Sequence, residues 1–239
     1  MNKDLIHNRF KKHLRDYDKN AKIQKLMAEK LINLCSRKKY KNILEIGCGT
    51  GFLTERISKN LEFENYTAID IVEDCETYIK KINPNINFKV ADAEKIHSEL
   101  TPQDLVISNA TLQWLSDFEG TVKSLLNIIK PEGELIFTTF GKENFREIFY
   151  ILGTGLKYYS EKELKDMFPD SEIISSEIHI MSFNLPKDVL KHLQLTGVNG
   201  IENKTWTKAD LKDFENLYSS LCVKRPTLTY NPVYIKINK

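Results

Sequence analysis

A glycine-rich segment, Glu45-Ile46-Gly47-Cys48-Gly49-Thr50-Gly51, directly follows a strand-like run that begins at Asn42. Its three glycines stand at alternate positions, and a helix-like pattern begins at Phe52. Glycine has no Cβ and adopts positive φ, so such a loop lets a ligand lie close to the backbone. The free N–H groups at the start of the next helix add polar contacts. The segment therefore predicts a binding site for an adenosine-bearing ligand.

The spacing of the glycines separates the candidate ligands. A dinucleotide fingerprint needs a third glycine three positions after the second, but Phe52 stands there and Gly51 comes one position early. No Gly-Lys-Ser/Thr follows, so a phosphate loop is also excluded. The pattern acidic-x-Gly-x-Gly-x-Gly resembles the glycine loop of S-adenosylmethionine-dependent methyltransferases. By this resemblance, the acidic residue Glu45 positions the amino group of the methionine moiety, through its backbone or through a water molecule.

Two carboxylates end the next two predicted strands. Asp70 ends the run Asn65–Asp70, nineteen positions after Gly51. An acid about 20 residues beyond the glycines binds the ribose hydroxyls in nucleotide-binding α/β folds, and a carboxylate accepts the two hydrogen bonds that a diol donates. Asp92 follows the third strand, and the resemblance implies that it accepts the adenine amine. Either acid could instead cap the helix that follows it.

Alternating strands and helices must position these residues. Strands are predicted at 42–46, 65–70, 86–90, 104–108 and 134–139, and helices at 3–35, 52–60, 73–82 and 117–129. A turn is predicted at Lys130–Gly133. This alternation predicts an α/β fold, a doubly wound parallel sheet with right-handed crossovers. Ligands bind at the carboxyl ends of such strands, where Gly47, Asp70, Asp92 and Asn109 would meet.

The pattern changes after Thr139. Helices are predicted at 160–168, with Ser160 and Glu163 at capping-box spacing, and at 186–195 and 207–221, with a Gly197–Gly200 loop between the last two. Strands are predicted at 172–183 and 228–238. In methyltransferases of this fold the last two strands form an antiparallel edge pair, giving a seven-stranded Rossmann-like sheet. We therefore expect one domain with four parts, namely a helical cap (1–38), a cofactor-binding core (40–183), a helical lid (184–225) and a final edge strand (226–239).

A narrower resemblance covers nearly the whole chain. The chain resembles the O-methyltransferases of biotin synthesis that esterify the free carboxylate of malonyl-acyl carrier protein. The match is carried by Arg9-Phe10 with Tyr17-Asp18 and Ala21-x-x-Gln24, by Ser108–Leu115, by Leu195–Gly200 and by Leu228–Tyr234. The cofactor-binding residues expected by this reading are Gln24, Glu45, Gly47, Cys48, Gly49, Gly51, Asp70, Ile71, Asp92, Ala93 and Asn109.

Such a reaction needs no general base. A malonyl carboxylate has a pKa near about 4 and is ionised at neutral pH, and the five histidines are dispersed. Tyr17 and Arg146 are the candidate catalytic residues that orient the carboxylate, although Arg146 could equally lie on a solvated helix face. Trp114 could wall the substrate pocket or pack in the core. Phe149, Tyr150, Tyr158 and Tyr159 could line a thioester channel or pack the lid.

Composition excludes other classes. The net charge of +2 is too small to indicate a nucleic-acid partner. Residues 1–20 are polar without an apolar segment, so we expect no secretion signal, and no apolar run approaches a membrane span. The scattered cysteines argue for a reducing compartment and against disulfides or a zinc site. We expect a cytoplasmic monomer without a metal.

Two alternatives remain open. A small-molecule O- or C-methyltransferase acting on a free carboxylic acid or a quinone precursor would share every cofactor motif. A non-catalytic S-adenosylmethionine-binding module would share them too. An acidic carrier protein would favour a basic lid patch, for which the candidates are Lys204, Lys208, Lys212, Lys224 and Arg225.

Overall fold

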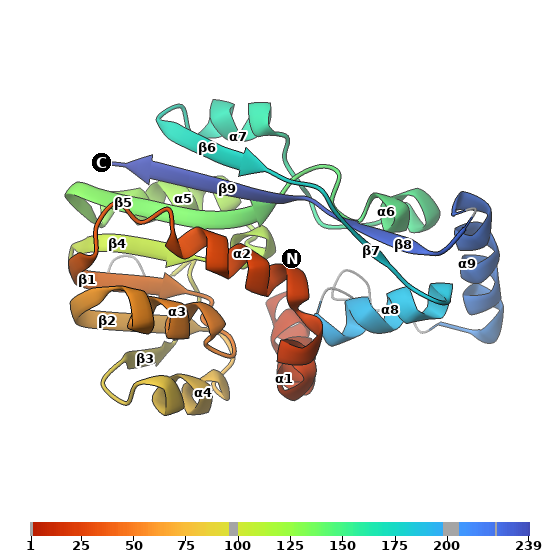
Figure 1. The fold of residues 1–239 in the computed structure, drawn as a ribbon, viewed down its shortest axis with the longest axis horizontal. Helices are drawn as coiled ribbons and strands as arrows, with labels where there is room; N and C mark the ends of the chain where they lie inside the picture. Colours follow the sequence, from red (N-terminus) through yellow and green to blue (C-terminus); the bar gives the residue numbers. More distant parts are fainter. Residues whose placement is uncertain (1, 96–99, 198–205, 223) are drawn as a thin grey trace.

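A twisted sheet forms the centre of the protein (Figure 1). The computed structural model describes residues 2–95, 100–197, 206–222 and 224–239. Over these residues the main sheet has seven strands in the order β3-β2-β1-β4-β5-β9-β6. Their bounds are β1 Lys39–Ile46, β2 Glu62–Asp70, β3 Asn87–Val90, β4 Gln103–Ser108, β5 Ile129–Phe140, β6 Ser171–Ser176 and β9 Pro232–Asn238.

Helices cover both faces of this sheet. Their bounds are α1 Lys3–Asn20, α2 Lys22–Ile32, α3 Phe52–Asn60, α4 Cys75–Ile82, α5 Phe118–Asn127, α6 Arg146–Leu152, α7 Glu161–Met167, α8 Pro186–Leu195 and α9 Lys208–Leu221. Ile43 packs with side chains of α2, α3 and α4, and its neighbour Leu44 packs with those of α5 and α7. Both faces of the carboxyl half of β1 are thus buried, as in a parallel sheet that helices cover on both sides.

The predicted parallel core is confirmed. β1 pairs in parallel with β2 and β4, and β4 pairs in parallel with β5. β9 runs antiparallel to both β5 and β6, which gives the expected antiparallel pair at one side of the sheet. β6 lies at the edge, however, because β9 inserts between it and β5.

The predicted strands 172–183 and 228–238 are each two strands. β7 (His179–Ser182) and β8 (Thr227–Tyr230) pair as a separate antiparallel ribbon. Asn231 separates β8 from β9, and its side-chain amide donates to Ser176 Oγ and to the Glu177 carbonyl. Pro232 follows and has no N–H for a ladder. At this point the chain therefore passes from the ribbon, which belongs to a second lobe, into the main sheet.

This lobe lies beyond the carboxyl ends of the strands and consists of α6, α8, α9 and the β7–β8 ribbon (Figure 1). Its apolar core includes Phe145, Val189, Phe214, Tyr218 and Tyr230, and it continues to Met27 of α2 and Phe140 of β5. The lid helices predicted at 186–195 and 207–221 are present, and Thr207 is the N-cap of α9. The Gly197–Gly200 loop falls mostly outside the described residues. The division into cap, core and lid as functional parts stays a prediction.

Three local predictions have clear outcomes. The capping box of Ser160 and Glu163 is confirmed at the start of α7. The N-terminal helical stretch predicted at 3–35 is present as two helices, because the chain breaks at Ala21 between α1 and α2. The turn at Lys130–Gly133 is a bulge inside β5, where Glu132 has a φ of 63°.

Over the described part of the chain, no helix combines the length and apolar character that crossing a membrane requires.

Candidate active site

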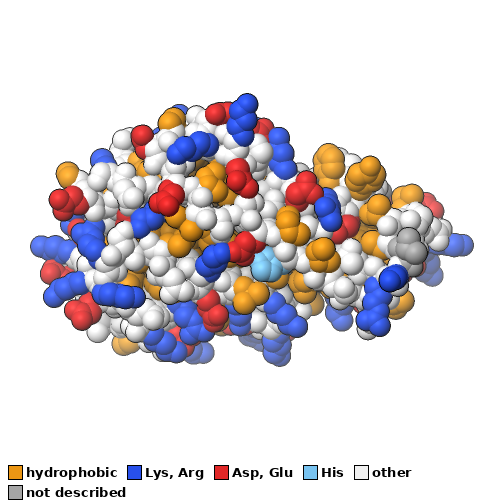
Figure 2. All heavy atoms as spheres, turned by 45° about the horizontal axis from the view of Figure 1, so that its top comes forward, with side chains coloured by type: hydrophobic (Ala, Val, Ile, Leu, Met, Phe, Trp, Pro, Cys, Tyr) orange, Lys and Arg blue, Asp and Glu red, His pale blue; other side chains and the backbone are white. Residues whose placement is uncertain are grey.

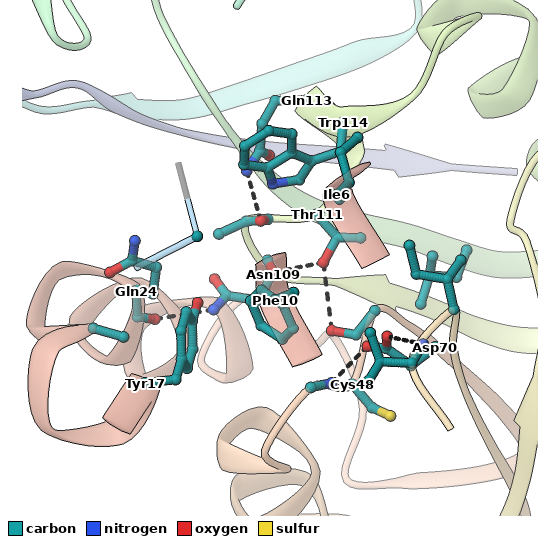
Figure 3. A pocket seen from close by; sticks show the side chains of 18 of the residues that line it. Ile6, Phe10, Tyr17, Gln24, Cys48, Asp70, Asn109, Thr111, Gln113 and Trp114 are labelled. Carbon is teal, nitrogen blue, oxygen red and sulfur yellow. Dashed lines mark hydrogen bonds between the residues drawn. The ribbon is translucent and has the colours of Figure 1, made fainter. Parts of the chain in front are cut away.

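A cavity opens at the carboxyl ends of β1, β2 and β4, with α1 and the start of α2 on its far side (Figure 3). Most of the residues predicted from sequence meet there. Those that line it are Tyr17, Gln24, Glu45, Gly47, Cys48, Gly49, Asp70, Ile71, Asp92, Ala93, Asn109 and Trp114. Gly51 and Arg146 do not.

The glycine loop forms the floor of this cavity, and its conformation requires glycine. Gly47 has a φ of 70°, and a Cβ there would lie 2.1 Å from Thr111 Oγ1. Gly49 has a φ of 52° and faces the ring of Phe10, which would lie 3.7 Å from an added Cβ. A side chain at either position would be strained and would occupy space between the loop and its neighbours.

Gly51 was predicted to contact the cofactor, but it lies outside the cavity. It has a φ of 82° and caps the start of α3. A Cβ there would lie 2.4 Å from Ile82 Cδ1 on α4. This glycine therefore permits close packing of two helices, and its contact with the cofactor stays a prediction.

Asp70 joins the end of β2 to the glycine loop. Its Oδ2 accepts a hydrogen bond of 2.9 Å from the Gly49 N–H, and its Oδ1 accepts one of 2.9 Å from the Val72 N–H. The side chain is buried, which raises its pKa, while these backbone donors act in the opposite direction. A carboxylate oxygen accepts more than one hydrogen bond, so Asp70 can hold the loop and also meet a diol.

Asp92 is tied to the N-terminal helix. Lys3 Nζ lies 2.5 Å from Asp92 Oδ2 and also pairs with Glu94. Burial works to raise the pKa of Asp92, but the hydrogen bond and charge of Lys3 outweigh it and hold the pKa below its usual value. The first turn of α1 is thereby anchored at the end of the cavity expected to hold the adenine.

Glu45 carries the clearest unmet polar group of the cavity. Thr54 Oγ1 donates to its Oε2 at 2.6 Å, and the Tyr66 hydroxyl donates to the same oxygen. Its Oε1 is buried without a hydrogen-bond partner. Burial raises the pKa of Glu45 to about 7, against the effect of the Thr54 and Tyr66 hydrogen bonds. A cation placed in this cavity would satisfy the free oxygen and favour its ionised form.

The break at Ala21 brings two side chains to one cavity wall. The Ala21 N–H donates to the Tyr17 carbonyl at 2.8 Å, and the chain then turns into α2. Tyr17 lies before this break and Gln24 lies after it (Figure 3). Desolvation raises the pKa of Tyr17 well above its usual value, so its hydroxyl is a hydrogen-bond donor at neutral pH. Gln24 Oε1 is buried without a hydrogen-bond partner.

Asn109 connects three elements through its side chain. Its Nδ2 donates to the Gln24 carbonyl at 2.9 Å, and its Oδ1 accepts from Thr138 Oγ1 at 2.8 Å. The amide thus joins β4 to α2 and β5, and a cofactor contact by Asn109 stays a prediction. Trp114 is half-buried in the short 3-10 helix Leu112–Trp114 and lines the same cavity.

Arg146, the second candidate catalytic residue, does not line this cavity. Phe145 adopts a left-handed conformation with a φ of 55° at the start of α6 and turns its own ring into the core. Arg146 is consequently 51% exposed, pairs with Glu143 at 3.1 Å and lines a second cavity. Whether Arg146 meets the substrate there stays a prediction.

Sequence reasoning assigned no site role to several lining residues. Phe10 and Thr111 lie within the quoted stretches Arg9-Phe10 and Ser108–Leu115, and the Phe10 ring packs against the Tyr17 ring at a tilt, with centroids 4.9 Å apart. Phe145 and Leu156 also line the cavity, and no local sequence pattern marked them.

Fold and cavity together define the class. The cavity combines a glycine loop after β1, acids at the ends of β2 and β3, and a carboxylate oxygen without a hydrogen-bond partner. These features fit a nucleoside that carries an ammonium group. The protein is therefore an S-adenosylmethionine-dependent methyltransferase. A family model described as a methyltransferase domain matches residues 14–171, and the chain belongs to this family.

Curated relatives make the comparison more specific. A malonyl-[acyl-carrier protein] O-methyltransferase of Chlorobium luteolum is 36% identical, and the match covers 99% of this chain and 95% of the relative. One of Calditerrivibrio nitroreducens is 37% identical over 97% of this chain and 95% of its own length. The crystal structure of the YcgJ protein from Bacillus subtilis shares the fold, with a TM-score of 0.64 and 12% identity over 90% of this chain and 97% of that one.

Proposed function

We propose that this protein methylates the free carboxylate of a malonyl thioester carried by acyl carrier protein, an early step of biotin synthesis. The relatives support this substrate, since proteins named for that reaction match the chain over nearly its whole length. The observation in the structure that carries the proposal is the character of the cavity. Beyond the glycine loop its walls are mainly apolar and aromatic, and no histidine is among the residues that line it in the described chain.

This environment suits an acceptor that is already ionised. When bound, S-adenosylmethionine supplies a methyl group on a positively charged sulfur. A carboxylate needs no base to attack it, because its pKa of about 4 leaves it charged at neutral pH. Opposite charges disappear as the methyl group moves, so the exclusion of water by Phe10, Trp114 and Phe140 favours the reaction.

Residues at the two ends of the cavity would hold the two reactants. Gly47 and Gly49 permit close approach to the backbone, Asp70 accepts from the ribose hydroxyls, and the free Oε1 of Glu45 meets the ammonium. The Tyr17 hydroxyl donates to the acceptor carboxylate and fixes its direction of approach. Its pKa is raised, so it remains a donor throughout.

The carrier protein would dock beside the second lobe. Lys208 and Lys212 lie exposed on α9, and Lys224 and Arg225 are exposed near the start of β8. Lys204, the fifth residue expected in this basic patch, lies outside the described residues. An acidic carrier would be steered to such a surface. A cytoplasmic location and a monomeric state belong to the same proposal.

Complementation tests the function in a cell. A bacterial strain that lacks the methyl transfer of biotin synthesis should grow without biotin when it expresses this protein. Expression of Tyr17→Phe to the same level should restore growth poorly. A well-expressed, folded wild-type protein that restores no growth would contradict the proposal.

A further inference from the structure

A second cavity adjoins the cofactor cavity. It encloses about 520 Å³ and lies between α6, α8 and the segment 154–158. The side chains of Phe145, Leu156 and Tyr158 line both cavities. A chain lying in the second cavity would therefore end at the place where the acceptor must meet the methyl group.

We propose that this second cavity is the channel for the thioester-bearing arm of the carrier protein, an inference that rests on the proposed function. The acceptor carboxylate must reach a buried cavity while the carrier protein stays outside, so a slender arm must cross the lobe. The walls suit such an arm, because Ile148, Leu190 and Leu193 provide apolar contact along its length. Of the aromatic stretch noted in the sequence, Phe149, Tyr150 and Tyr158 line this channel, whereas Tyr159 stacks on Phe118.

Asn144 supplies a polar group inside the channel. Its side chain is 2% exposed, and its Oδ1 accepts from the Asn231 N–H at 3.1 Å. It interacts with the Tyr158 hydroxyl, yet its Nδ2 makes no hydrogen bond of normal geometry. A buried donor of this kind is costly unless a ligand satisfies it. The carbonyl groups of a thioester-bearing arm are acceptors of the required type.

The mouth of the channel combines exposed apolar side chains with cations. Phe149 is 62% exposed and Tyr150 is 82% exposed. Hydrophobic side chains gather at the end of the molecule that carries α6 and α9 (Figure 2). Three cations also line the channel, namely Lys142, Arg146 and Lys157. Glu163 and Glu143 pair with the first two of these, and Lys157 lies over the ring of Tyr159. Surface ion pairs contribute little free energy, so Lys142 and Arg146 can exchange their present partners for acidic groups of a carrier protein at little cost in free energy.

Gly155 gives a direct way to block the channel. A Cβ at this position would meet only Phe149 Cδ2, at an ordinary contact distance of 3.8 Å. Gly155→Phe should therefore fold and place a ring beside Phe149. Asn144→Asp retains the acceptor for Asn231 and removes the amide donor. Lys162→Ala, an exposed change on α7 that lines neither cavity, is the matched control.

The test compares acceptors with and without the arm. Methyl transfer is measured with malonyl-coenzyme A, which bears the arm, and with the malonyl thioester of N-acetylcysteamine, which lacks most of it. Gly155→Phe should raise KM for malonyl-coenzyme A by about tenfold or more, and Asn144→Asp should raise it by about fivefold. For Gly155→Phe, both KM for the short thioester and the affinity for S-adenosylhomocysteine should stay within about twofold of wild type.

The outcomes separate the two proposals. If wild-type protein methylates malonyl thioesters but Gly155→Phe changes KM for both acceptors equally or for neither, the channel assignment is overturned alone. If the wild-type protein methylates no malonyl thioester, the proposed function fails, and the channel assignment fails with it.

Discussion

The Gly49 N–H donates a 2.9 Å hydrogen bond to Asp70 Oδ2, which ties the glycine loop to the end of β2. The same carboxylate accepts from the Val72 N–H. Asp70 therefore fixes the loop before any ligand arrives, and a ligand that meets Asp70 meets a loop already in place. Pre-organisation of this kind lowers the cost of binding.

Replacing Asp70 tests this link. Asp70→Asn puts an amide donor or a weaker acceptor opposite the Gly49 N–H, so about 1–3 kcal/mol of binding should be lost. Isothermal titration with S-adenosylhomocysteine should show affinity reduced by about tenfold or more. Asp166→Asn, an exposed change on α7, should bind as wild type does. Equal affinities for the two variants would remove Asp70 from the site.

Gly47 tests whether the loop conformation or the space around it matters more. Gly47→Ala should cost about 1 kcal/mol for the left-handed backbone and about 1–3 kcal/mol more for overlap with Thr111. Gly153→Ala is the matched control, because Gly153 has a φ of 66° with nothing within 4 Å of an added Cβ. Thermal and denaturant unfolding of both variants would measure the difference. An equal decrease in the free energy of unfolding for both variants would mean that overlap with Thr111 does not destabilise Gly47→Ala.

Glu45 makes ligand binding depend on pH. Its pKa in the folded protein is raised to about 7 from 4.5, so its contribution to stability is full below 4.5 and is lost as pH rises through about 7. A ligand ammonium favours the ionised form, and binding below pH 7 must release the proton. Affinity for S-adenosylhomocysteine should therefore rise by about tenfold at most for each pH unit up to about 7 and then level off.

Glu45→Gln should remove this pH dependence, because the amide does not titrate in that range. Titration calorimetry in two buffers of different ionisation enthalpy would count the proton released on binding. Wild-type protein that releases none at pH 6 would show that Glu45 does not change its protonation state on binding, which would contradict this prediction.

The Tyr17 hydroxyl carries the proposed orientation of the acceptor. Tyr17→Phe keeps the ring against Phe10 and should lower kcat by about tenfold to a hundredfold, with stability and cofactor affinity unchanged. Steady-state rates with malonyl-carrier protein provide the check. A variant as fast as wild type would remove Tyr17 from the catalytic residues.

Carrier docking should depend on salt and on α9. Lys208→Ala with Lys212→Ala should raise KM for malonyl-carrier protein by about threefold or more, and the effect should fade as salt rises. Lys39→Ala with Lys41→Ala removes two exposed lysines from β1 and serves as the control. If both double variants behave alike, the carrier does not dock on α9.

Local patterns in the sequence predicted the parallel sheet and most of the candidate residues that line the cavity, because each depends on neighbours along the chain. Glycine spacing placed the loop, and strand ends placed Asp70 and Asp92 at one edge of the sheet. Arg146 could not be placed in this way. The left-handed turn at Phe145, whose N–H donates to the Thr229 carbonyl at 2.7 Å, depends on a strand far along the chain and directs Arg146 outwards.

Long-range packing also determines two features of the second lobe that the sequence did not predict, the break at Asn231 and the burial of Asn144. The break at Asn231 is set by its bonds to Ser176 and Glu177, residues that are remote in the sequence. Asn144 was not predicted for the same reason, because its burial follows from its contact with Asn231, which is also remote in the sequence. Residues held by such contacts carry no periodic signal of their own.

Transfer of a labelled methyl group tests the central claim most directly. Purified protein is incubated with methyl-labelled S-adenosylmethionine and an equimolar mixture of malonyl-carrier protein, free malonate and carrier protein without a malonyl group. We expect label on the malonyl group of the carrier adduct, as a methyl ester, and on neither of the other acceptors. Label only on the free acid, or cofactor that binds without losing its methyl group, would contradict the account.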